Sequence, residues 1–108
     1  MKVMYEKNSK LIKAISDPKR LQIMDILSCG EMCANELLEH FEFSQPTLSH
    51  HMKVLLENEL VNLRKDGLWS YYSLNLMECN KIILFIMNII TDTEDCICKD
   101  VKKQTNNC

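Results

Sequence analysis

The spacing of apolar residues predicts a mainly α-helical chain with one small β-hairpin. Apolar side chains recur every three to four positions in several stretches, and this is the period of an amphipathic helix. Two shorter runs, residues 60–65 and 68–73, instead contain β-branched or aromatic residues and alternate between apolar and polar positions, which is typical of strands. The stretches predicted as helices are residues 5–15, 18–29, 32–42, 44–58 and 75–92.

The second predicted helix has clear start and stop signals. Asp17 is a favourable N-cap, Pro18 suits the first helical position, and Gly30 ends the helix. We expect this helix to be largely buried, and we expect Cys29 and Cys79 to be small core side chains because they lie among apolar periodic residues. The apolar residues that fill the helix are Leu21, Ile23, Met24, Ile26 and Leu27.

Residues 44–58 form the helix around which the chain is organised. Ser44 can cap its start with its side-chain oxygen, and Pro46 lies in the first turn, where a missing N–H costs little. One face is apolar, through Leu48, Met52, Leu55 and Leu56. The other face carries short polar side chains that can bind base edges and phosphates, although such a face is by itself more often plain solvated surface. Those residues, with the cap, are Ser44, Gln45, Thr47, Ser49, His50 and Lys53.

The predicted hairpin follows directly after this helix. Asp66-Gly67 separates the two strand-like runs, and this dipeptide favours a tight hairpin turn. Arg64 and Lys65 are expected at its tip, where they could reach a phosphate backbone or a minor groove. Two short helices, the second with a polar outer face, followed by a hairpin are the order of a winged helix-turn-helix. This order favours binding to double-stranded DNA.

The last predicted helix has more apolar surface than one face needs. Its apolar residues cover more than one side, whereas a surface helix requires a single stripe. A second copy of the chain is the simplest partner, with dimerisation through the first and last helices; the alternative is that the first helix alone covers the surplus. A two-fold homodimer would also suit an inverted-repeat operator. The residues are Leu76, Met77, Ile82, Ile83, Leu84, Phe85, Ile86, Met87, Ile89 and Ile90.

Composition and charge favour a soluble protein. With 108 residues, 46% hydrophobic and 26% charged, the chain is expected to form one folded domain, residues 1–92, followed by a flexible cysteine-containing tail, residues 93–108. The start has no signal-peptide pattern and the longest apolar run is too short to span a bilayer, so we expect a cytoplasmic protein without a membrane partner. The net charge is −2, but residues 1–20 hold six Lys or Arg and two acidic residues, a patch suited to phosphates.

Four of the six cysteines are candidate ligands. In a reducing cytoplasm, this many thiols indicates metal binding or redox chemistry. Cys96 and Cys98 would point to the same side of an extended segment, and Cys108 could fold back to supply a third thiolate for a thiophilic ion. A variant would join Cys33 to Cys96 and Cys98. The alternatives are a disulfide-forming redox switch and tail thiols that bind nothing specific.

The chain resembles the ArsR/SmtB family of metal- and metalloid-responsive winged-helix repressors over about residues 10–90. The resemblance rests on SDPKRLQIMDIL, SQPTLSHHMKVL and LVNLRKDGLWSYYSL. It implies a homodimer that leaves operator DNA when an inducer ion binds. It also implies that the major groove is read by Gln45, Thr47, Ser49 and His50, and that Lys65 makes the wing contact.

The resemblance narrows the choice of inducer ion. The Cys-x-Cys pair of arsenic- and cadmium-responsive members is half present here, because Cys33 matches the first cysteine and Asn35 stands in place of the second. Zinc-responsive members use ligands on the last helix, where this chain has no histidine. The tail looks like that of members with arsenic cysteines near the C-terminus. This implies arsenite or antimonite as inducer, while general ligand preference leaves cadmium and lead open.

Two other function classes remain open at this stage. A thiol enzyme or ion carrier would use Cys96 and Cys98, but no His or acidic residue at informative spacing supports a catalytic nucleophile, so we expect no enzyme. A winged helix used only for protein contacts is compatible with the net charge. Salt-dependent binding of duplex DNA would argue against it.

Overall fold

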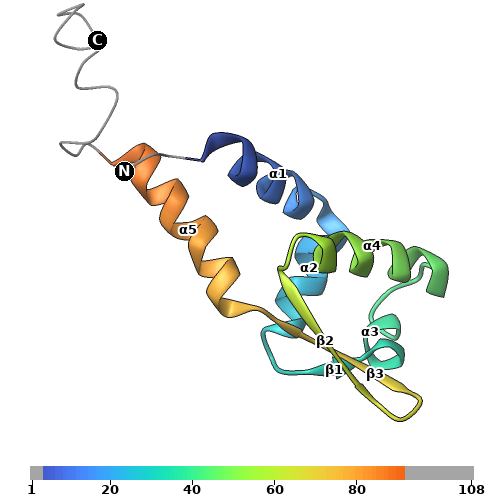
Figure 1. Cartoon of the computed structure of the whole chain (residues 1–108). Coiled ribbons are helices and arrows are strands. Elements are labelled where there is room, and N and C mark those ends of the chain that lie inside the picture. Colours follow the sequence, from blue (N-terminus) through green and yellow to red (C-terminus); the bar gives the residue numbers. More distant parts are fainter. Residues whose placement is uncertain (1–3, 92–108) are drawn as a thin grey trace, which may run out of the picture.

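A computed structural model describes residues 4–91 of the chain. Its helices form a body with a three-stranded antiparallel sheet of order β1-β3-β2 at one end (Figure 1). The prediction of a mainly helical chain with one hairpin is confirmed. The elements are α1 (Tyr5–Ile15), α2 (Pro18–Leu27), β1 (Met32–Cys33), α3 (Ala34–Leu38), α4 (Gln45–Glu57), β2 (Val61–Asp66), β3 (Trp69–Leu74) and α5 (Leu76–Ile90).

Helix α2 begins as its sequence signals predict. Asp17 Oδ1 accepts hydrogen bonds from the backbone N–H groups of Lys19 (2.8 Å) and Arg20 (3.2 Å). Burial opposes ionisation of Asp17, but these N–H donors outweigh it and lower the pKa of the carboxyl. The helix is less buried than expected: Leu21 is 51% exposed, since the face that packs inward is the one through Ile23 and Leu27.

The prediction of a single helix over residues 32–42 is wrong in part. Met32 and Cys33 form a strand that pairs with Tyr72 and Tyr71 of β3, so the helix begins only at Ala34 and ends at Leu38. Tertiary pairing with the hairpin overrides the local helical pattern here. Cys29 was expected in the core but is exposed, because it follows the end of α2 in the turn that leads to this strand.

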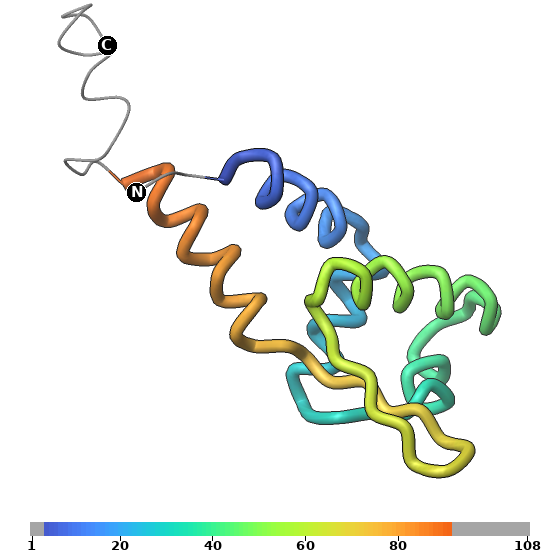
Figure 2. Tube along the Cα trace, in the orientation of Figure 1, coloured from blue at the N-terminus to red at the C-terminus, as the bar shows by residue number. Residues whose placement is uncertain are grey.

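The hairpin turn lies one residue later than the sequence pattern suggested. Asp66 still pairs with Trp69, so the turn consists of Gly67 and Leu68. Gly67 has a φ of +63°, a value that glycine adopts without steric cost. The hairpin formed by β2 and β3 projects from the helical body as a wing (Figure 2).

The core joins all the helices to the base of the wing. Helix α4 contributes Leu48, Met52 and Leu55, and the chain then enters the sheet through buried Leu60 and Val61. These apolar contacts fix where the outer face of α4 lies relative to the wing. The buried apolar residues are Leu11, Ala14, Ile23, Leu27, Leu37, Leu48, Met52, Leu55, Leu60, Val61 and Ile82.

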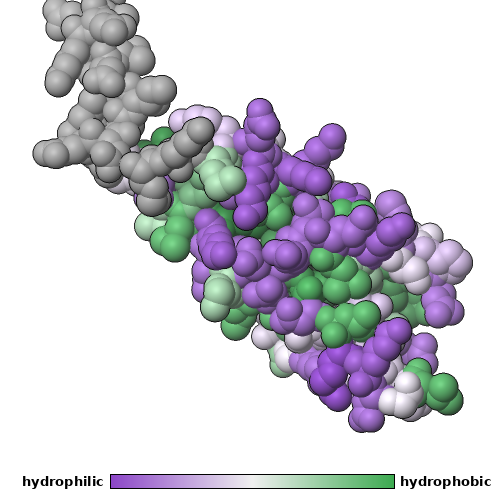
Figure 3. Space-filling view, viewed as in Figure 1, coloured by the Kyte–Doolittle hydropathy of each residue, from purple (hydrophilic) through white to green (hydrophobic). Residues whose placement is uncertain are grey.

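Helices α1 and α5 lie against each other and extend away from this core (Figure 1). Tyr5 and Phe85 meet edge to face, with ring centroids 6.4 Å apart. Within α5, however, Ile82 is the buried apolar residue and most of the others remain exposed, so α1 alone does not cover the surplus apolar surface. Figure 3 shows apolar side chains open to solvent where these helices meet. The exposed ones on α5 are Leu76, Met77, Ile83, Leu84, Ile86, Met87, Ile89 and Ile90.

Candidate nucleic-acid interface and ion-binding cysteines

The outer face of α4 is polar and open to solvent, as the sequence predicts. Leu48 and Met52 turn inward, whereas Ser49 and His50 between them are exposed. The exposed residues are Ser44, Gln45, Thr47, Ser49, His50 and Lys53. Together they provide donors, acceptors and one cation along a single helix, which is the chemistry that base edges and phosphates require.

Ser44 occupies the N-cap position of α4 but does not act as the expected side-chain cap. Its backbone is extended, with φ −76° and ψ 165°, and its hydroxyl makes no hydrogen bond to the free N–H groups of the first turn. The Oγ atom lies instead 3.2 Å from Oγ1 of Thr47. The two hydroxyls therefore form a pair at the exposed start of the helix.

His51, the neighbour of exposed His50, is buried and bound to Arg20. Arg20 Nη1 lies 3.1 Å from His51 Nδ1, and Arg20 Nε donates to the carbonyl of Ala14 at the end of α1. The Phe43 ring lies 5.6 Å from the His51 ring, measured between centroids. Burial is the main cause that lowers the pKa of His51. This contact was not anticipated from the sequence, although position 51 falls on the apolar side of α4 between Leu48 and Leu55.

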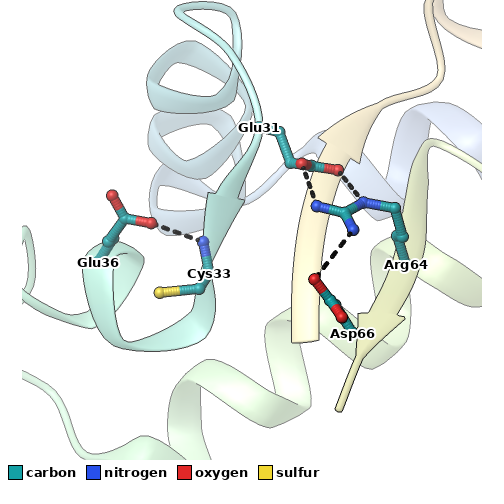
Figure 4. Close-up of polar contacts among 5 residues, drawn as sticks. All are labelled: Glu31, Cys33, Glu36, Arg64 and Asp66. Carbon is teal, nitrogen blue, oxygen red and sulfur yellow. Dashed lines mark hydrogen bonds and ion pairs between the residues drawn. The ribbon is translucent and has the colours of Figure 1, made fainter. Parts of the chain in front are cut away.

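The two wing cations differ in their surroundings. Arg64 donates to Glu31 through Nη2 (2.8 Å to Oε1) and Nε (3.1 Å to Oε2) (Figure 4). Its guanidinium also lies 4.5 Å from the centroid of the Tyr71 ring. The hydrogen bonds from Arg64 lower the pKa of the Glu31 carboxyl. Lys65 is exposed and pairs in register with Ser70. Both cations lie within β2 rather than at the tip, which is formed by Gly67 and Leu68.

The basic N-terminal patch is only partly a free surface. Lys7, Lys10 and Lys13 of α1 and Lys19 of α2 are exposed. Arg20 is half-buried and bound to His51, so it is not free to hold phosphates as expected.

Cys33 is the one candidate ion ligand that falls within residues 4–91. It is 8% exposed at the start of α3, and its backbone N–H donates to Glu36 Oε1 at 3.0 Å (Figure 4). Cys96, Cys98, Cys108 and the rest of the predicted tail lie outside the described residues. Among residues 4–91 there is no group of three or more His, Cys, Asp or Glu placed to hold a metal ion. The expected thiolate site therefore stays a prediction.

Cys79 partly meets its expectation of a core position. It is half-buried, its Sγ lies 3.7 Å from the Leu60 carbonyl, and burial raises the pKa of its thiol. A thiol held in this way is a poor nucleophile at neutral pH.

Across the described part of the chain, no helix is long and apolar enough to cross a membrane.

Comparison with known proteins assigns the family. The model of the bacterial regulatory protein arsR family matches residues 17–62, the segment from α2 to the start of the wing. The chain is 54% identical to an arsenical resistance operon repressor of Staphylococcus aureus over 98 residues, which is 91% of this chain and 94% of that protein. It is 52% identical to the arsenical resistance operon repressor of Staphylococcus xylosus, with the same coverage.

A solved structure agrees with these relatives. The crystal structure of a possible transcriptional regulator for arsenical resistance is 31% identical, with a TM-score of 0.68, covering 82% of this chain and 92% of that one. The winged helix-turn-helix prediction is thereby confirmed. Sequence and fold together place the chain in the ArsR family of bacterial regulatory proteins.

Proposed function

We propose that this protein is a cytoplasmic transcriptional repressor that binds double-stranded operator DNA through α4 and the wing. The observation that carries the proposal is the exposed polar face of α4, held outward by the buried residues Leu48, Met52 and Leu55. In helix-turn-helix proteins the second helix enters the major groove, and its outward residues contact the bases. The 54% identity to an arsenical resistance operon repressor supports the same role here.

The repressor acts as a homodimer in this proposal. The apolar residues exposed on α5 exceed what a solvated helix needs, and the start of α1, which lies beside α5, adds Tyr5 and the preceding Met4 at 55% and 57% exposure. Large exposed apolar patches of this kind mark protein–protein interfaces. A two-fold axis through α1 and α5 would present two copies of α4 to the two half-sites of an inverted repeat.

The inducer in this proposal is a thiophilic ion, arsenite or antimonite, bound by the thiolates of Cys96, Cys98 and Cys108. The arsenical resistance repressors among the relatives support this class of ion. Cys33 is a further candidate because it lies at the start of α3, which is the helix that precedes α4 in the helix-turn-helix. Cadmium, lead and oxidation of the same thiols are the alternative signals.

A binding experiment tests the DNA-reading part of the proposal. Fluorescence anisotropy would measure Kd for a duplex from upstream of the gene and for a scrambled duplex, over a range of salt concentrations. We expect specific, salt-dependent binding, and we expect Gln45→Ala and Ser49→Ala to cost about 1–3 kcal/mol each on the specific duplex only. Gln22→Ala, an equally exposed change on α2, is the matched control. Equal affinity for both duplexes in every variant would contradict the proposal.

A further inference from the structure

One partly buried polar contact joins the DNA-reading helix to two other helices. Arg20 of α2 places Nη1 3.1 Å from Nδ1 of His51 on α4, and its Nε donates to the carbonyl of Ala14 on α1. His51 is 9% exposed, whereas His50 beside it is exposed. The Phe43 ring lies 5.6 Å from the His51 ring, and Asp17, the N-cap of α2, accepts from the backbone N–H of Arg20. A single guanidinium thus connects the end of α1, the first turns of α2 and the middle of α4.

The contact requires His51 to be neutral. Arginine has only N–H donors, so Nδ1 of His51 must accept and the ring proton must be on Nε2. A protonated His51 would have donors on both nitrogens and would place a second cation 3.1 Å from the guanidinium. Buried hydrogen bonds of this kind are costly to break, because the polar groups are left without a partner.

Burial and the charged groups around His51 act on its protonation in different directions. Burial disfavours a positive charge at His51 most strongly, and the largest charge effect, from Asp17 at the N-cap of α2, favours it. Arg20 on α2 and His50 on α4 again disfavour it. The pKa of His51 is lowered as a result.

We propose that Arg20 and His51 are positioning residues for DNA recognition, and that protonation of His51 releases α4 from α1 and α2 and weakens DNA binding. We call this contact the Arg20–His51 tether. The inference rests on the proposed function, in which α4 reads DNA. His51 follows Ser49 and His50 on the same helix, so a small rotation or shift of α4 would move the DNA-facing side chains away from their contacts. Neither residue needs to touch DNA for this effect.

A pH profile tests the proposal. The background is His50→Gln, which leaves His51 as the one histidine of α4. On this background we compare His51→Gln and His40→Gln by measuring Kd for the upstream duplex from about pH 8 to about pH 5.5 at constant ionic strength. Glutamine can still accept from Arg20 but does not titrate. His40→Gln is the matched control, since His40 is exposed at the end of α3.

The expected outcomes are distinct. The His50→Gln protein and its His40→Gln derivative should lose about tenfold in affinity as the pH falls, whereas the His51→Gln derivative should change by less than about twofold. A flat profile in the His50→Gln protein would overturn the proposal. An equal loss of affinity in the His51→Gln derivative would overturn it as well.

The salt dependence separates a tether from a phosphate contact. Arg20→Lys keeps the positive charge but lacks the fork that reaches both Ala14 and His51, whereas Arg20→Gln also removes the charge. For both variants we expect weaker DNA binding at every salt concentration with an unchanged slope of log K against log salt. If Arg20 instead bound a phosphate directly, Arg20→Gln would reduce the size of that slope by about 1. A reduced slope would therefore assign Arg20 to the DNA surface and reject the tether.

A measurement without DNA distinguishes failure of the tether from failure of the proposed function. Amide hydrogen exchange of the free protein should show faster exchange in α4 for Arg20→Lys and Arg20→Gln than for the wild type, with Gln22→Ala as the control. Unchanged exchange in α4 for both Arg20 variants would overturn the tether even if DNA binds as proposed. If exchange in α4 is faster in the Arg20 variants but the wild type binds no DNA, the contact still holds α4 in place and its role in DNA recognition is rejected.

Discussion

Glu31 and Arg64 form a two-point ion pair that connects the segment after α2 to the first strand of the wing. Arg64 Nη2 lies 2.8 Å from Glu31 Oε1, and Nε lies 3.1 Å from Oε2 (Figure 4). Arg64 pairs in register with Tyr71, and Tyr71 pairs on its other side with Cys33. The carboxylate of Glu31 therefore occupies guanidinium donors that could bind a DNA phosphate.

Replacing Glu31 by Gln should strengthen DNA binding. The change removes a negative charge beside the wing and frees Arg64 to contact a phosphate, so the gain should be largest at low salt. Anisotropy titrations at several salt concentrations measure it. Asp25→Asn makes the same change of charge at an exposed position of α2 that forms no ion pair within residues 4–91, and it should have less effect. If Glu31→Gln weakened binding instead, the ion pair would be holding Arg64 in its DNA-binding position.

Truncating the inner face of α4 should destabilise the whole domain. Leu55 is fully buried, and Leu→Ala at such a site costs about 2–5 kcal/mol of unfolding free energy. Urea denaturation followed by circular dichroism measures the loss. Leu68→Ala at the exposed hairpin turn is the matched control and should change stability by less than about 0.5 kcal/mol. Similar effects of the two changes would contradict the described core.

The end of α4 contains a backbone conformation that glycine would favour. Glu59 has a φ of 60°, and the N–H groups of Glu59 and Leu60 donate to the carbonyls of Leu56 and Leu55, both at 3.0 Å, as in a Schellman motif. Glu59→Gly should raise the unfolding free energy by up to about 1 kcal/mol, because it removes the steric cost of this conformation.

Glu57→Gly is the control for this prediction. Glu57 is the last residue of α4, where glycine should lower the unfolding free energy by up to about 1 kcal/mol. Chemical denaturation of the two variants compares the signs. Destabilisation by Glu59→Gly of the same size as that by Glu57→Gly would contradict the assigned conformation.

Folding stability should fall as the pH drops below about 6.5, the ordinary pKa of histidine. The folded-state pKa of His51 is lowered, so below that pH the unfolded chain binds a proton that the folded chain does not yet bind. The loss continues until the pH reaches the lowered pKa of the folded state. Urea denaturation across this window should show a smaller decrease for His51→Gln than for the wild type. Identical pH dependence of the unfolding free energy in both proteins would show that His51 is not the group whose proton binding differs between the folded and the unfolded chain.

The helices and the hairpin were predictable because their signals are local. Asp17 and Pro18 mark the start of α2, and the period of Leu48, Met52 and Leu55 identifies the inner face of α4. The polar face of α4 follows from the same period. These features depend on residues a few positions apart, which a sequence displays directly.

The contacts that depend on distant residues could not be predicted in this way. β1 exists because Met32 and Cys33 reach Tyr72 and Tyr71, about forty residues later in the chain. Arg20 and His51 are 31 residues apart, and Arg64 and Glu31 are 33 apart. Arginine, histidine and glutamate are common on protein surfaces, so only the folded arrangement shows which of them are partners.

The central claim is that this repressor releases its operator when a thiophilic ion binds the tail cysteines. The most direct measurement is fluorescence anisotropy of the reduced protein on its upstream duplex, titrated with arsenite, cadmium and zinc. We predict release by arsenite at one ion per subunit, no release by zinc, and loss of the arsenite response in the Cys96→Ser/Cys98→Ser protein with DNA affinity unchanged. Tight binding that arsenite leaves intact in the wild type, or equal release from the double variant, would contradict the account.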